Sequence, residues 1–204
     1  MPSRNRDKIY NPQSYYHIYN TGSNSLVIFK ENNDYETFIN LLKRYLINKT
    51  QKDKRGREYK SFLNDIELLA FCLMPTHYHL LIYQRSPNVI TSFMRRVATS
   101  YSTYFNHKYK RAGPLFNERY KASKVEHEKY LLPISRYMHL EPKNYKHWAF
   151  SSLPYYSGNK ENNWIAPGKV LGSVSVNEYL NFLADRQSYN NEFGELKVQL
   201  ANSI

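Results

Sequence analysis

Two histidines, His77 and His79, are separated by a single residue near the start of an apolar run. In a β-strand this spacing places both imidazoles on one face, while Tyr78 and Leu80 face the opposite, core side. Two neutral imidazoles on a rigid strand provide half of a divalent-metal site and leave other coordination positions open. A pair of this kind is unsurprising in a chain with 7 histidines, so a metal site requires a third ligand from elsewhere.

A nucleophile and the third ligand can be sought together among the 20 tyrosines. A tyrosine that attacks a group bound to the same metal has to share one helix face with a ligand three or four residues away. Tyr137 is the only tyrosine with an aspartate, glutamate or histidine four residues later, and that residue is Glu141. The three-residue spacing adds Tyr104 on a basic helix and Tyr189 in a weakly patterned tail. His139 lies about 200° around the helix from Tyr137 and is not expected to be a ligand.

The same spacing is compatible with a core aromatic at Tyr137 and a solvated helix end at Glu141. The composition favours the catalytic interpretation, because lysine and arginine outnumber aspartate and glutamate by 29 to 17 and give a net charge of +12. A basic surface attracts phosphates, and aromatic residues, 16% of the chain, can stack on unpaired bases. The side chains predicted to contact DNA are Arg95, Arg96, Lys108, Lys110, Arg111, Arg119, Lys121, Lys124, Tyr15, His17 and Tyr19.

The remaining composition excludes other classes of protein. The single cysteine, Cys72, excludes an intramolecular disulfide, and its apolar surroundings indicate a small buried side chain. The N-terminus is polar and basic and has no apolar segment typical of a signal peptide. No run approaches the roughly 20 apolar residues that span a bilayer. We expect a cytoplasmic protein that associates with the nucleoid when it binds DNA.

Hydrophobic periodicity predicts the elements that position these residues. Strands are expected over 15–20, 66–74, 77–84 and 115–125, and helices over 35–46, 89–109 and 126–140. This order predicts an α+β fold of the ferredoxin-like (RRM-like) kind, an antiparallel sheet with helices on one face. Pro133 either kinks the last of these helices or marks its start. The chain is expected to divide into a basic N-terminal arm (1–10), one catalytic domain (11–155) and an accessory C-terminal segment (156–204).

Four blocks of the sequence resemble a known family. The string FCLMPTHYHLLI (71–82) is similar to the His-hydrophobic-His signature of the single-tyrosine HUH, or IS200-like, transposases. The strings YHIYNTG (16–22), GPLFNERYK (113–121) and RYMHLEP (136–142) resemble blocks of its branch called REP-associated tyrosine transposases, in the expected order. The resemblance covers roughly residues 10–155. It departs from the family pattern at Tyr78, where an aliphatic residue is usual, and at Glu141, where several relatives have an amide.

The resemblance implies a ferredoxin-like fold, a Mg²⁺ or Mn²⁺ ion, and single-stranded DNA beside a hairpin, in repeated palindromic or element-end sequences. It places the nucleophile at Tyr137 and the ligands at His77, His79 and Glu141. The implied reaction is transesterification at a phosphodiester, which forms a 5′-phosphotyrosine link and a free 3′-OH. The protein is expected to be a monomer or a homodimer.

Three alternatives remain open from the sequence. The first is a non-catalytic module of the same fold that binds single-stranded nucleic acid. The second is a replication initiator or relaxase, although a helicase-sized extension is absent. The third is a metallo-hydrolase that uses the same ligands with water as the nucleophile.

Overall fold

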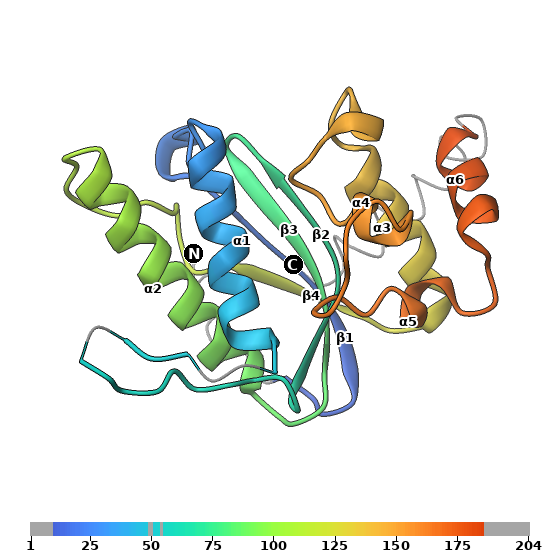
Figure 1. The fold of residues 1–204 in the computed structure, drawn as a ribbon, viewed down its shortest axis with the longest axis horizontal. Coiled ribbons are helices and arrows are strands. Elements are labelled where there is room, and N and C mark those ends of the chain that lie inside the picture. Colours follow the sequence, from blue (N-terminus) through green and yellow to red (C-terminus); the bar gives the residue numbers. More distant parts are fainter. Residues whose placement is uncertain (1–9, 49–50, 54, 186–204) are drawn as a thin grey trace, which may run out of the picture.

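Strands and helices alternate along the first two thirds of the chain. The computed structural model describes residues 10–48, 51–53 and 55–185 (Figure 1). The elements are β1 (Ser14–Thr21), α1 (Asn32–Leu46), β2 (Ile66–Met74), β3 (His77–Gln84), α2 (Val89–Lys108), β4 (Lys121–Val125), α3 (Leu131–Leu140), α4 (Leu153–Tyr156), α5 (Gly168–Leu171) and α6 (Val176–Ala184). No helix in this part of the chain is both long and apolar enough to cross a membrane.

The four strands form one antiparallel sheet in the order β2-β3-β1-β4. In this order the first and third strands are neighbours at the centre and the fourth strand lies at an edge. A β-α-β-β-α-β chain gives this arrangement when each helix returns the chain across the sheet, which is the ferredoxin-like topology. The predicted α+β fold class is therefore confirmed.

Helices cover both faces of the sheet rather than one (Figure 1). The fully buried ring of Tyr78 packs against Phe38 of α1, with 5.0 Å between ring centroids. The next residue, His79, contacts Tyr137 of α3 at 5.6 Å. Since neighbouring strand residues point to opposite faces, α1 and α3 lie on opposite sides. The expectation of helices on one face was wrong on this point, because α3 has to reach the face to which the two histidines point.

Two predicted boundaries differ from the structure at the ends of β4 and α3. The fourth strand begins at Lys121 instead of residue 115, because Phe116 forms an isolated bridge with Gly22 and the chain joins the sheet only later. Helix α3 begins at Leu131 instead of residue 126, after a short 3-10 turn. Pro133 lies in its first turn, where the missing N–H would have no helical partner in any case. Pro133 therefore marks the start of the helix.

The C-terminal segment packs against α3. The Tyr179 hydroxyl of α6 lies 2.7 Å from Nδ1 of His139 and 2.8 Å from Oγ of Ser135, both on α3. His139 Nε2 lies 2.6 Å from Oγ of Ser152, which precedes α4. The predicted boundary at residue 155 thus falls inside a packed region, and the division into a domain and an accessory segment stays a prediction. Residues 1–9 and 186–204 lie outside the described residues, whereas Tyr10, at the end of the predicted arm, is buried.

Asp34, in the first turn of α1, is fully buried and joins α1 to α2. Its carboxylate accepts hydrogen bonds from Nζ of Lys108 at 2.7 Å and from the hydroxyls of Tyr104 at 2.9 Å and Tyr109 at 2.8 Å. Burial would raise the pKa of Asp34, but these bonds outweigh burial and hold the pKa below its ordinary value.

Replacement of Asp34 should therefore destabilise the fold. Asp34→Ala is expected to lower the free energy of unfolding by about 3 kcal/mol, because it leaves three side-chain donors and the backbone N–H groups of Lys30 and Glu31 without their acceptor. Glu31→Ala is the control: its carboxylate also pairs with Lys108 but is 56% exposed, so we expect a loss below about 1 kcal/mol. Urea denaturation measures both, and equal losses would contradict a dominant role for Asp34.

Candidate active site

His77 and His79 of β3 and Glu141, immediately after α3, form one cluster on the face of the sheet that α3 covers. The Glu141 Oε1 atom lies 2.7 Å from Nε2 of His77, and Oε2 lies 3.5 Å from Nε2 of His79. One ligand atom from each residue lies within 4.8 Å of the other two. Within residues 10–48, 51–53 and 55–185, no other group of three histidine, cysteine or acidic side chains has this geometry.

The Glu141 carboxylate fits a cation in this position. Its Oε2 atom is buried and has no hydrogen-bond partner in the described part of the chain. Burial opposes ionisation of Glu141, but its interactions with His77 and His79 outweigh burial and lower its pKa to about 2. The Oε1 atom lies within hydrogen-bond distance of His77 Nε2, whereas Oε2 is 3.5 Å from His79 Nε2 and can serve as a ligand to a cation that lies between the three side chains. Two imidazoles and one carboxylate suit a divalent transition metal such as Mn²⁺.

Each histidine has a second partner that leaves Nε2 directed at the cluster. The Nδ1 atom of His77 lies 3.0 Å from the Thr76 hydroxyl, and Nδ1 of His79 lies 2.9 Å from Nε2 of His17 on β1. If Nε2 of His79 binds a metal, the imidazole proton has to lie on Nδ1. The Nδ1–H group then donates a hydrogen bond to Nε2 of His17. Burial and the proximity of His79 lower the pKa of His17 well below its ordinary value, so His17 is a neutral acceptor.

Tyr137 of α3 lies beside this cluster, one helical turn before Glu141. The edge of its partly buried ring contacts His79 at 5.6 Å and His17 at 6.4 Å between centroids. The four-residue spacing on α3 and the two-residue spacing on β3 thus bring together the four residues predicted from the sequence. His139 is fully buried on the other side of α3, as its position around the helix predicted.

Comparison with known proteins identifies the part of the chain that contains these residues. Residues 43–141 match the family described as "Transposase IS200 like". This part of the chain is similar to IS200-like transposases. The matched range includes His77, His79, Tyr137 and Glu141, so all four residues of the cluster lie in the part with this similarity. No curated protein matches the chain.

A solved structure has the same fold as most of this chain. It is described as the REP associates tyrosine transposase bound to a REP hairpin. The two chains superpose with a TM-score of 0.55 at 15% identity, over 81% of this chain and 92% of the other. At this level of identity the similarity establishes a shared fold.

Two residues predicted to contact DNA lie next to the cluster. Strand register places His79, Tyr19 and Lys121 side by side across β3, β1 and β4, on one face of the sheet. The Tyr19 ring stacks against His79 at 5.8 Å, and Nζ of Lys121 lies 5.9 Å from the Tyr19 centroid. Tyr15 shares this face farther along β1 and donates a hydrogen bond to Glu128. An aromatic ring and an exposed ammonium therefore adjoin the candidate metal centre.

The other predicted DNA contacts are distributed over several surfaces. His17 is 2% exposed, which leaves little of its surface for DNA. Three cations already have protein partners: Lys108 binds Asp34, Arg111 binds Asn106 and Lys124 binds Glu126. The exposed ones are Arg95, Arg96, Lys110 and Arg119.

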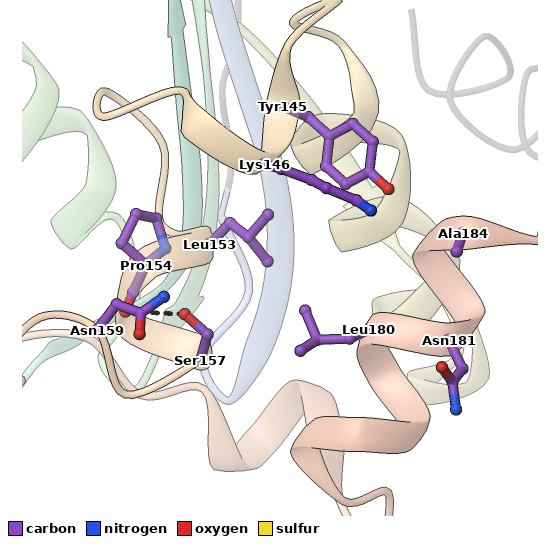
Figure 2. A pocket seen from close by; sticks show the side chains of 9 residues that line it. All are labelled: Tyr145, Lys146, Leu153, Pro154, Ser157, Asn159, Leu180, Asn181 and Ala184. Carbon is purple, nitrogen blue, oxygen red and sulfur yellow. Dashed lines mark hydrogen bonds between the residues drawn. The ribbon is translucent and has the colours of Figure 1, made fainter.

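A pocket of about 370 Å³ at the C-terminal side holds none of the predicted site residues. Figure 2 shows Leu180 of α6 and Leu153 of α4 pointing into it, with Tyr145 and Lys146 at one end. The pocket therefore contributes nothing to the metal cluster.

The hydrogen bond between His17 and His79 predicts a measurable effect on metal affinity. His17→Phe keeps an aromatic ring but removes the acceptor that holds the His79 tautomer, so we expect about 10- to 100-fold weaker Mn²⁺ binding. His17→Asn can offer an amide oxygen and should restore part of the affinity. Titration calorimetry measures both, with Tyr15→Phe on the same strand face as the control. Unchanged affinity in His17→Phe would show that His79 needs no such partner.

Proposed function

We propose that the protein is a metal-dependent endonuclease and strand transferase of single-stranded DNA, with Tyr137 as the nucleophile. The proposal rests on one observation. Tyr137 and Glu141, a helical turn apart on α3, lie next to His77 and His79 of β3. All four residues belong to the part of the chain that is similar to IS200-like transposases. The buried Oε2 atom of Glu141, which has no hydrogen bond and lies 3.5 Å from His79, supports a cation site beside Tyr137.

The metal ligands and the tyrosine have separate roles in the proposed reaction. A divalent cation held by His77, His79 and Glu141, either Mg²⁺ or Mn²⁺, would draw charge from the scissile phosphate and orient the phosphate. Tyr137 Oη attacks the phosphorus, a bond forms between them, and the bond from phosphorus to the 3′ oxygen breaks. The tyrosine proton is lost and the 3′ oxygen leaves as a hydroxyl after protonation. The DNA stays attached through a 5′-phosphotyrosine link.

The covalent link makes rejoining possible. Because the phosphotyrosine is still a phosphodiester, another 3′-OH can attack it, release Tyr137 and join two strands without ATP. A single nucleophilic tyrosine permits one attachment per active site at a time. The chain would thus exchange DNA strands as well as cut them, which is the activity expected of a transposase.

We propose hairpin-bearing single-stranded DNA as the substrate and the REP-associated branch as functional relatives. The sequence blocks that resemble this branch support the proposal, and the solved neighbour of the same fold is bound to a REP hairpin. The net charge of +12 suits a polyanion. A monomer or homodimer that acts in the cytoplasm is part of the same proposal.

The test is a covalent adduct. Protein is incubated with labelled, hairpin-bearing single-stranded DNA and Mn²⁺, and the products are separated under denaturing conditions. We expect a labelled band at the size of protein plus DNA, and none with EDTA. Binding without an adduct would favour a non-catalytic module, and cleavage without an adduct would favour a hydrolase with water as nucleophile.

A further inference from the structure

A groove of about 620 Å³ lies between α2 and the segment 114–120, away from the metal cluster. Asn20 of β1 lines it, and Asn20 pairs with Tyr78, whose side chain faces the α1 side of the sheet. The groove therefore opens on the side opposite His77 and His79. None of the four residues of the candidate active site lines it.

The lining of the groove combines cations, aromatic rings and hydrogen-bonding groups. Arg95 of α2 and Arg119 are exposed and form no ion pair with any residue that the structure describes. Phe116 and Tyr120 contribute rings, and Glu118 contributes one carboxylate. The Asn20 amide is already hydrogen-bonded to the backbone of Thr21 and Glu118. Guanidinium groups bind phosphate with two hydrogen bonds, and aromatic rings stack on bases of any sequence. The volume falls within the range of small-ligand sites, and this chemistry matches a nucleotide.

The groove connects with the active site around an open edge of the sheet. Tyr120 lines the groove, and the next residue, Lys121, lies on the metal face beside Tyr19. Among the residues that the structure describes, β4 is an edge strand, so no further described strand lies between them. Lys121 is two strands from His79, about 10 Å at the usual strand spacing. About three nucleotides of DNA cover that distance.

We propose that this groove binds one unpaired nucleotide of the substrate strand, a few positions from the cleaved phosphodiester. Its base would lie against Phe116, and its phosphate would contact Arg95 and Arg119. Capture of this nucleotide would fix which phosphodiester reaches Tyr137. The link to cleavage rests on the function proposed above, whereas the binding of the nucleotide does not require cleavage.

The experiment measures binding alone, so that its failure is distinct from a failure of the catalytic proposal. Tyr137→Phe protein in EDTA is titrated with a fluorescent hairpin oligonucleotide that has single-stranded tails. An abasic site is placed at each tail position in turn. We expect one position at which the missing base weakens binding about tenfold, the size of a single stacking contact.

Variants of the groove test whether the base at that tail position binds in the groove. Ala98 lines the groove on α2, so Ala98→Trp should fill it and remove the abasic effect at that position. Arg119→Ala, in an exposed segment, should weaken binding and reduce the salt dependence by about one phosphate contact. If Ala98→Trp does not fold, the abasic scan in Arg119→Ala takes its place. Lys146→Ala, which removes one charge from the C-terminal side, should leave the abasic position unchanged.

Two results would overturn the proposal. The first is that no abasic position weakens binding, which would mean that the protein contacts only the DNA backbone in the tails. The second is a position-specific effect that persists undiminished in the groove variants, which would place the base elsewhere.

Discussion

Tyr137→Phe is expected to abolish the covalent protein–DNA adduct and to lower strand cleavage by about 10³-fold or more. The substitution removes only Oη, the atom that attacks phosphorus. The ring that contacts His79 and His17 stays in place, so the fold, Mn²⁺ binding and DNA binding should be unchanged. Single-turnover cleavage of a labelled hairpin substrate measures the loss, and denaturing gels measure the adduct.

Tyr130→Phe is the matched control for this prediction. Tyr130 immediately precedes α3 and is partly exposed. It lies almost two helical turns from Tyr137. Its loss should leave adduct formation within about twofold of the wild type. Adduct at the wild-type level in Tyr137→Phe would mean that another residue is the nucleophile.

Glu141→Ala is expected to weaken Mn²⁺ binding about 100-fold, or by about 2.7 kcal/mol, since it removes one of three ligands and the only negative charge of the cluster. Cleavage at low Mn²⁺ should fall with it and recover in part at high Mn²⁺. Glu141→Gln keeps a ligand oxygen without the charge and should lie between the two. Titration calorimetry and cleavage rates at several Mn²⁺ concentrations test this order. Equal Mn²⁺ affinity for all three proteins would remove Glu141 from the metal site.

The local parts of the site could be predicted from the sequence because they depend on short spacings. The strand period sets His77 and His79 on one face, and the helical period sets Tyr137 above Glu141. The helical period also predicted that His139 points away from the cluster, and the structure places His139 against Tyr179. Neither period depends on how the elements pack, so the side-chain directions predicted from both are found in the structure.

The contacts between distant segments could not be obtained in this way. The alternation of β1 puts Tyr15, His17 and Tyr19 on one face, but a shift of two residues in register would exchange their neighbours without moving any of them to the other face. The observed register pairs Tyr19 with His79 and leaves His17 within hydrogen-bond distance of it. The role of His17 beside the metal ligand was therefore missed.

The placement of helices and cations also depends on tertiary packing. The apolar stripe of α3 says that one side is buried, but not which face of the sheet buries it. Lys108 was predicted from the sequence to contact DNA, but its ammonium group is bound by Asp34, which lies 74 residues earlier. The strand predicted from residue 115 begins later because Phe116 bridges to Gly22 at the end of β1.

The residue to which the DNA is attached in the covalent adduct shows whether Tyr137 is the nucleophile. Trypsin digestion of the adduct, after nuclease trimming of the DNA, should give a nucleotide attached through its 5′ phosphate to the fragment that contains residues 137–143. The released DNA piece should end in a 3′-OH that a polymerase can extend. Attachment to a different residue, attachment through a 3′ phosphate, or cleavage that leaves no adduct would mean that Tyr137 does not form a 5′-phosphotyrosine link.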